Sequence, residues 1–274
     1  LPAVRDREGD VLLLANTLLR RFCQDLNRPV LKFSTDAVAA MTDAQLQALT
    51  PQQLGALRTA QIQALSSQQF AALGTDQLAG LTSQQIAAIE TRDLQGLSTS
   101  HVAALGVRQV SGLTSAQITN LSTEQVAALE TEDLAALRAT QFTALRSGQI
   151  QALSTAQVSS LKLAQIQNLA AANVTAMNTS QVNALTTSQL QVFNTAQMAA
   201  LTSTQLGGMS TEQLASIKTN LIVAIATNAL AGLSTAQMQA FSPAQIGQMS
   251  SQQIRALSTT QISAIATDDL AGVT

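Results

Sequence analysis

This sequence has no Trp and no Tyr, and it contains only six Phe, four Pro and one Cys among 274 residues. Without large aromatic rings, the core must consist of aliphatic side chains and of thin elements that approach closely. The single Cys23 cannot form an internal disulfide, so it is compatible with a reducing or an oxidising compartment. No apolar run approaches the ~18 residues of a membrane helix. We therefore predict a water-soluble protein without a membrane-spanning segment.

Charged residues are also scarce, at 11% of the chain, where a globular protein has roughly a quarter. There are 14 Lys and Arg against 16 Asp and Glu, and no basic stripe. A surface of this kind lacks the phosphate-neutralising charge on which nucleic-acid binding depends. We expect the long array described below to bind no nucleic acid. Leu1 takes the place of an initiator Met, so we also expect a true N-terminus upstream of it.

What the chain has in abundance is Leu, Ala, Ser, Thr and Gln, arranged in blocks of eight. From residue 41 to residue 272 there are 29 consecutive blocks without an insertion, with the consensus Leu-Ser/Thr-Ser/Thr-x-Gln-Leu/Ile/Val-x-Ala. Positions 1 and 6 are always apolar, and position 8 is mostly Ala or Gly. Position 5 is Gln in 22 blocks, and the exceptions are Asp93, His101, Asp133, Asn173, Leu221, Ala229 and Asp269.

An eight-residue period fits neither a continuous helix nor a strand. At ~100° per residue the apolar stripe of a helix would drift about 80° per block, and no face would stay buried. Ser or Thr at position 2 with Gln at position 5 instead forms a capping box, which starts a new helix in every block. Examples are Ser122 with Gln125, Thr50 with Gln53, Ser154 with Gln157 and Ser258 with Gln261, and Pro51 and Pro243 stand at the first helical position.

Each block is thus predicted to be a helix of roughly two turns that can be stable only by stacking on its neighbours. We predict an all-α solenoid of short capped helices, narrow and rod-like or gently superhelical. Positions 1 and 6 fill its interior, and the small residue at position 8 allows close crossing. Two blocks per coil would make a rod on the order of 120–140 Å, at ~8–10 Å per coil. Three blocks per coil is the alternative.

The first forty residues differ from the array. Apolar residues at three-to-four spacing predict a helix over 11–26, and Ser34 is expected to cap a second helix. Residues 1–38 resemble the start of the helical lid of sigma-54-dependent transcription activators, which are AAA+ proteins. The resemblance rests on Leu1-Pro2, Arg5-x-Arg7-x-x-Asp10, Arg20-Arg21, Arg28-Pro29 and Phe33-Ser34. That family's phosphate loop, metal-holding acids and sigma-contacting loop have no counterpart in this sequence, so no ATP hydrolysis is expected.

We therefore predict two regions, a truncated lid-like segment over 1–40 and the octapeptide solenoid over 41–274. Residues 33–40 already follow the octad phase. The octads also resemble Leu-Thr-x-x-Gln arrays of very large bacterial proteins, some of which are adhesin-like.

Few residues of this sequence are candidates for catalysis or metal binding. His101 is interpreted as a polar substitute in a capping position, because no other metal ligand is at suitable spacing. Glu90 with Asp93 and Glu130 with Asp133 are interpreted as solvated helix starts rather than calcium or acid–base sites. Cys23 is taken as a packed thiol, and residues 218–233 are expected to form a buried bend or a contact surface. The Met residues in apolar slots are taken as core filler; these include Met177, Met198, Met209, Met238 and Met249.

The sequence therefore predicts a non-enzymatic bacterial repeat protein that serves as a spacer or protein-interaction scaffold. No catalytic, cofactor-binding or metal-binding residue is predicted, and the expected partner is a protein rather than a small-molecule substrate. The alternative is a fragment of a sigma-54-dependent transcription regulator. A third hypothesis, that regular hydroxyl rows bind ice or a carbohydrate surface, is weaker because many hydroxyls act as caps. A cytoplasmic location is expected, with a secreted or cell-surface location as the alternative.

Overall fold

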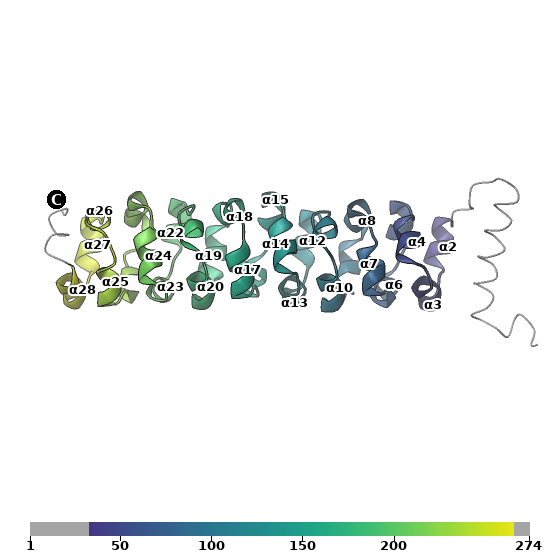
Figure 1. Ribbon diagram of the computed structural model, residues 1–274, viewed down its shortest axis with the longest axis horizontal. Helices are drawn as coiled ribbons and strands as arrows, with labels where there is room; N and C mark the ends of the chain where they lie inside the picture. The colour runs from purple at the N-terminus through teal and green to yellow at the C-terminus, as the bar shows by residue number, and fades with distance from the viewer. Residues whose placement is uncertain (1–32, 266–274) are drawn as a thin grey trace, which may run out of the picture.

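A straight rod of stacked short helices makes up the part of the protein that the computed structural model describes, residues 33–265 (Figure 1). The predicted helix over 11–26, Cys23 and Asp269 lie outside these residues. Within residues 33–265 every regular element is helical and there is no strand. The α-helices contain four to six residues, so they are shorter than the two turns that the octad predicts. The predicted all-α solenoid with an eight-residue period is confirmed.

The short helices end early because two extended residues separate one helix from the next. Between α12 (Ser115–Asn120) and α13 (Thr123–Ala127), Leu121 has φ −62° and ψ 145°, and Ser122 has φ −71° and ψ 165°. The N–H of Leu121 still bonds to the carbonyls of Gln117 and Ile118, which closes the last turn of α12. Positions 1 and 2 of the octad therefore form the corner, and the α-helix begins at position 3 and ends at position 6, 7 or 8.

Three octads make one coil, because each helix packs against the third helix before it and the third after it. The helices thus form three rows that run the length of the rod. The first row contains α2 (Thr35–Ala39), α5 (Thr59–Gln63), α8 (Ser83–Ala88), α11 (Val107–Val110), α14 (Thr131–Ala136), α17 (Thr155–Ser160), α20 (Thr179–Asn183), α23 (Ser203–Gly207), the 3₁₀ helix η3 (Leu230–Gly232) and α27 (Ser251–Ala256).

The other two rows follow the same rule. The second row contains α3 (Asp43–Gln47), α6 (Ser67–Ala72), α9 (Thr91–Leu94), α12 (Ser115–Asn120), α15 (Ala139–Phe142), α18 (Leu163–Gln167), α21 (Thr187–Leu190), α24 (Thr211–Ser216), α25 (Thr235–Met238) and α28 (Thr259–Ala264). The third row contains α4 (Pro51–Gly55), α7 (Thr75–Ala79), α10 (Thr99–Ala103), α13 (Thr123–Ala127), α16 (Ser147–Gln151), α19 (Ala171–Ala176), α22 (Thr195–Ala199), the 3₁₀ helix η2 (Thr219–Ala224) and α26 (Pro243–Ile246).

This arrangement corrects the expected two blocks per coil. The octad pattern leaves the number open, because it sets where each helix stops but not the angle through which the chain turns there. With three blocks per coil, the described residues form nearly ten coils, which at ~8–10 Å each give a rod of roughly 80–100 Å. The rod is accordingly shorter and thicker than predicted.

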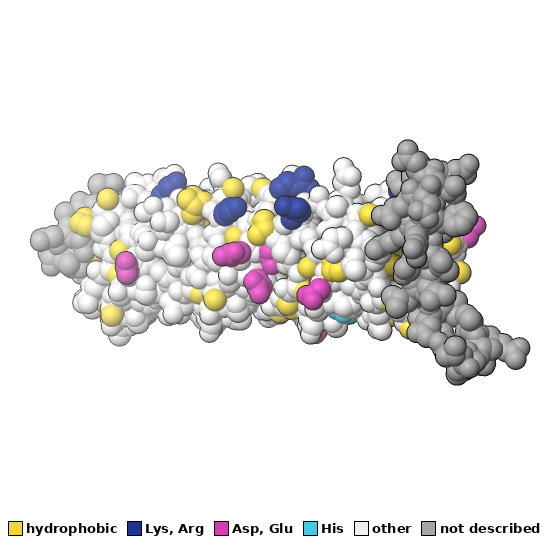
Figure 2. Space-filling model, turned by 45° about the vertical axis from the view of Figure 1, so that its right-hand side comes forward, with side chains coloured by type: hydrophobic (Ala, Val, Ile, Leu, Met, Phe, Trp, Pro, Cys, Tyr) yellow, Lys and Arg dark blue, Asp and Glu magenta, His cyan; other side chains and the backbone are white. Residues whose placement is uncertain are grey.

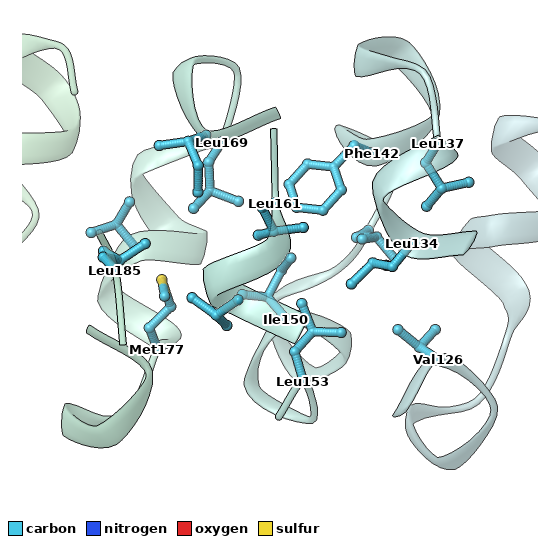
Figure 3. Close-up of a cluster of buried hydrophobic side chains, with 14 of the residues drawn as sticks. Val126, Leu134, Leu137, Phe142, Ile150, Leu153, Leu161, Leu169, Met177 and Leu185 are labelled. Carbon is cyan, nitrogen blue, oxygen red and sulfur yellow. The ribbon is translucent and has the colours of Figure 1, made fainter. Parts of the chain in front are cut away.

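The core is a continuous column of the apolar residues at positions 1 and 6. Figure 3 shows such side chains from all three rows pointing into one interior, with Phe142 and Ile150 from position 6 and Leu153 and Leu161 from position 1. These four are at most 5% exposed. The five Met residues interpreted as core filler are buried as well, which confirms that interpretation. Each buried Leu or Ile stabilises the fold by about 1.5–3 kcal/mol.

Small residues at positions 7 and 8 set the distance between neighbouring coils. A Cβ added at Gly232 would lie 2.0 Å from the backbone oxygen of Ser203, and one added at Gly112 would lie 2.5 Å from that of Ser83. In both pairs the partner begins the preceding helix of the same row. The predicted close crossing at position 8 is therefore present, and Gly occupies its tightest points.

Candidate functional site

The recurring polar element of the octads is the Gln at position 5, which bonds both locally and across the coil. In the octad 121–128, the N–H of Ser122 donates to Oε1 of Gln125 at 2.8 Å, and the N–H of Gln125 donates to Oγ of Ser122 at 3.1 Å. The other three predicted capping boxes and Ser34 as the cap of α2 are confirmed in the same way. Pro51 and Pro243 begin their helices as predicted.

The amide nitrogen of the same Gln has a second role that sequence analysis missed. Nε2 of Gln125 donates to the carbonyls of Leu94 and Leu97, both at 2.8 Å, 31 and 28 residues earlier. Gln149, Gln181 and Gln205 repeat these bonds along the rod. The acceptors are carbonyls at the end of a helix and the following corner, where intrahelical donors run out. We call this series of cross-coil bonds the glutamine ladder.

The glutamine ladder explains why position 5 varies less than position 2. Arg58, Gly74, Arg138, Arg146 and Lys162 occupy position 2 without a capping hydroxyl, yet in each block the backbone N–H still donates to the Gln side chain. Gln69, Gln77, Gln157 and Gln165, like most others, are buried. A buried amide that is fully bonded also holds the coils in register, since leaving it unpaired costs ~1–3 kcal/mol.

His101 replaces the Gln in capping its own helix but makes no cross-coil hydrogen bond among the described residues. Its Nδ1 accepts from the N–H of Ser98 at 3.2 Å, and its own N–H donates to Oγ of Ser98 at 3.2 Å. His101 therefore occupies the capping position in which the sequence places it. Among residues 33–265, no group of three or more His, Cys, Asp and Glu side chains is placed to hold a metal ion.

Asp93 and Asp133 are not the solvated helix starts that the sequence predicts, because both are buried, at 1% and 4% exposure. Oδ1 of Asp93 accepts from Oγ of Ser67 at 2.6 Å, whereas its Oδ2 is buried without a partner. Arg92 contacts both acids, with its Nη2 2.9 Å from Oε2 of Glu90 and its Nε 3.7 Å from Oδ1 of Asp93. At both helix starts the Glu is exposed and the Asp is buried, and Arg92 contacts both carboxyls of the first pair.

Electrostatic effects differ between exposed and buried acids of this region. Hydrogen bonds lower the pKa of the exposed Glu124, first from its own backbone N–H and then from the Ser122 and Thr123 hydroxyls. Burial raises the pKa of Asp133 to about 6, and the charges of Glu130 and Glu132 add to that effect. Asp133 therefore titrates near neutrality, unlike an ordinary surface acid.

The 218–233 segment is a local change of helix type rather than a bend. η2 and η3 replace α-helices where position 5 is Leu221 and Ala229, both of them buried. α9, α14 and α19 also lack both the Gln and a capping hydroxyl but keep Asp or Asn at position 5 and stay α-helical, whereas η2 and η3 have an apolar residue there. The coils on either side remain stacked through η2 and η3. Val223 is 53% exposed, so an apolar side chain does reach the surface there.

The surface of residues 33–265 carries few charges and has two open hollows near the start of the array. Figure 2 shows a few Lys and Arg side chains and a few Asp and Glu side chains scattered on a mostly white rod. One open hollow is lined by Gln47, Pro51 and residues 72–77. Another lies beside Asp43, whose Oδ2 accepts from Nε2 of Gln68 at 3.2 Å. No described helix has the length and apolar character needed to cross a membrane.

Comparison with known proteins identifies the repeat over part of the chain. A family model described as the ALTTAQ repeat matches residues 51–83, 86–123 and 126–163. Its six letters correspond to positions 8, 1, 2, 3, 4 and 5 of the octad, as in Ala152-Leu-Ser-Thr-Ala-Gln157. A search of curated proteins finds no match. The matched segments do not include residues 1–38, so the resemblance to the sigma-54 activator lid, and the domain boundary after residue 40, stay predictions.

The predicted Leu-Thr-x-x-Gln array is thereby supported over the matched segments, and the described structure extends the same coil on both sides of them. Residues 51–83, 86–123 and 126–163 of this chain are similar to the ALTTAQ repeat.

Proposed function

We propose that this protein is a non-catalytic spacer, a stiff rod that holds whatever lies at its two ends at a set distance. The observation that carries the proposal is the glutamine ladder, which ties each coil to an earlier one by buried bonds of 2.6 to 3.2 Å in most octads. A repeat array whose coils are joined only by apolar contacts can slide or bend, because such contacts are non-directional. Directed bonds at every coil oppose both motions.

The charge pattern supports protein partners rather than nucleic acid for the spacer. Arg138, Arg146 and Lys162 lie at position 2 of separate octads, and Glu124, Glu130 and Glu132 lie nearby in the sequence. Such mixed, sparse charge provides little of the counterion release on which phosphate binding depends. The proposal therefore includes a protein contact on the Ser, Thr and Gln surface. Binding of duplex DNA by the octad array at about 50 mM salt would contradict this part.

The spacer proposal is tested by distances between spin labels on the full chain with Cys23→Ser. One labelled pair is Thr59→Cys with Val107→Cys, and the other is Thr59→Cys with Ser251→Cys; all three sites are exposed and lie in the first row. They are two and eight coils apart, so we expect roughly 16–20 Å and 64–80 Å.

The ratio of the two distances distinguishes a rod from a flexible tether. A stiff rod extends linearly, so four times as many coils give about four times the distance. A flexible chain extends roughly as the square root of its length, so the ratio would be about two. Narrow distributions with a ratio near four support the spacer. A ratio near two, or a broad distribution for the longer pair, would overturn it.

A further inference from the structure

Three octads of residues 33–265 have Asp or Asn in place of the Gln, and comparing them shows what each side-chain atom does. In the octad of Asn173, Oγ of Ser147 donates to Oδ1 at 2.8 Å, and Nδ2 donates to the carbonyl of Leu145 at 3.2 Å. Ser147 lies 26 residues before Asn173, and Leu145 lies 28 residues before it. The Asn173 side chain thus keeps one of the two cross-coil bonds that a Gln makes in the glutamine ladder. In place of the second bond, its Oδ1 accepts from the hydroxyl of Ser147.

Asp93 has the same kind of hydroxyl donor as Asn173, and Nε of Arg92 lies 3.7 Å from its Oδ1 in addition. Oγ of Ser67, again 26 residues earlier, donates to Oδ1 at 2.6 Å. The second carboxyl oxygen, Oδ2, is buried without a partner. In the Asn173 octad, the atom at this position donates to the carbonyl of Leu145. A carboxyl oxygen can take over that role only when it carries a proton.

Asp133 lacks the hydroxyl donor as well. Val107 occupies the place that Ser67 and Ser147 take in the other two octads, and no hydrogen bond to the Asp133 carboxyl compensates for it among the described residues. The side chain is 4% exposed. Burial is the larger cause that raises its pKa to about 6, and Glu130 and Glu132 add like charge. Each of these circumstances favours the neutral carboxyl over the carboxylate.

The groups around Asp133 do little to stabilise its carboxylate form. Its helix α14 packs against α11 and α17. The residues of α17 are uncharged, and α11 contributes only Arg108, which forms no ion pair with Asp133. On its own helix and cap the neighbours are Glu130 and Glu132. No residue of these elements is placed to hold the carboxylate form.

We propose that Asp133 is a proton-dependent latch between α14 and the corner that precedes α11: its neutral carboxyl donates a hydrogen bond to the carbonyl of Leu105, and loss of the proton releases this bond. Leu105 precedes Asp133 by the same interval at which Leu145 precedes Asn173. When the carboxyl ionises, its oxygens and the carbonyl oxygen all accept and repel one another. The contact between these two coils, near the middle of the rod, then loosens.

The direction of the pH effect follows from the raised pKa. In the unfolded chain the pKa of Asp133 is near its ordinary 3.8, and in the folded rod it is about 6. The folded state therefore binds this proton more tightly, by roughly 100-fold for a shift of about two units. The stabilising contribution is fully present below pH ~4 and is lost as the pH rises to ~6. At higher pH this stabilising contribution is absent.

Hydrogen exchange of the full chain tests the latch locally. The readout is the opening equilibrium of the α11 and α14 amides between pH 5 and pH 8, after division by the intrinsic exchange rate. In the natural chain we expect opening to increase by about 10-fold from pH 5 to pH 8, because the rest of the ~100-fold effect falls below pH 5. Asp133→Asn should remove this dependence, because Asn supplies the donor at every pH. The amides of α20 and α23 serve as the internal control.

The matched pair Val107→Ser and Val107→Ala tests the role of the missing hydroxyl. Ser restores the donor that Ser67 and Ser147 provide, so the carboxylate is better tolerated and the pH midpoint of α14 opening falls by about one unit. Ala removes the same exposed side chain without adding a donor and should leave the midpoint near 6. Equal midpoints for both variants would overturn the proposal. So would an unchanged pH dependence in Asp133→Asn.

Discussion

The side-chain amide of Gln125 donates to the backbone carbonyl of Leu97 at 2.8 Å, across 28 residues of sequence and one coil of the solenoid. Its carbonyl oxygen at the same time accepts from the N–H of Ser122 at 2.8 Å. One side chain thus starts its own helix and completes the end of another. The octad therefore joins local capping to long-range stacking through a single residue type.

The glutamine ladder predicts a strong difference between buried and exposed Gln. Gln125→Ala leaves the N–H of Ser122 and the carbonyls of Leu94 and Leu97 without their partner, so we expect a loss of ~2–4 kcal/mol in unfolding free energy. The control is Gln167→Ala, at an exposed position 7, with an effect within ~0.5 kcal/mol. Urea unfolding followed by circular dichroism measures both. Equal effects would argue against the ladder.

Close coil contacts predict opposite outcomes for two Gly→Ala changes. At Gly232 the new Cβ would meet the Ser203 oxygen at 2.0 Å, so neighbouring coils must separate and stability should fall by ~2 kcal/mol or more. At Gly148 the nearest atom is Cγ2 of Thr123 at 3.8 Å, and Ala should add ~0.5–1 kcal/mol through helix propensity. Thermal melting distinguishes the two. A stable Gly232→Ala variant would mean that the coils are less tightly packed than described.

The three-octad coil predicts which deletions are tolerated. Removing residues 177–200 takes out one whole coil, and Gln205 should then donate to Ile150 and Leu153 in place of Val174 and Met177. We expect cooperative melting and a rod shortened by ~8–10 Å in small-angle X-ray scattering.

A shorter deletion at the same place is the control. Removing residues 177–180 puts the Gln residues just after the deletion out of register with carbonyls that lie before it, so the coils on either side should uncouple and melt at different temperatures. The shifted residues are Gln181, Gln189, Gln197 and Gln205. If both deletions behaved alike, stacking would not depend on the octad register.

Two substitutions in and just before the 3₁₀ helix η2 should convert it into an α-helix. Lys218→Ser with Leu221→Gln restores the capping box in η2 and offers an amide to the carbonyls of Leu190 and Phe193, the counterparts of the two acceptors of Gln125. We expect residues 219–224 to become α-helical and the stability to rise by about 1 kcal/mol. Backbone chemical shifts report the helix type.

Lys218→Ser alone is the control for this repair. It adds the capping hydroxyl without the cross-coil amide, so we expect it to leave the 3₁₀ helix largely in place. An identical result for the single and the double variant would contradict the role assigned to Gln.

Some features of this protein follow from the sequence because their causes are local. Ser122 and Gln125 are close neighbours in the chain, so their capping box can be inferred from the octad alone, and so can the helix start at Pro51. The inward direction of Phe142 and Ile150 follows from the apolar pattern in the same way. These predictions were confirmed, although the helices proved shorter than two turns because positions 1 and 2 are both extended.

Other features were decided only by the tertiary structure. Eight residues recur identically whether two or three blocks make a coil, since the number depends on the turn angle at residues such as Leu121 and Ser122. That angle places Leu97, and no other carbonyl with the same sequence context, within reach of Gln125. For the same reason the burial of Asp93 and Asp133 was predicted wrongly. Their solvent exposure depends on the neighbouring coil of the rod, and the position of that coil cannot be inferred from the local sequence.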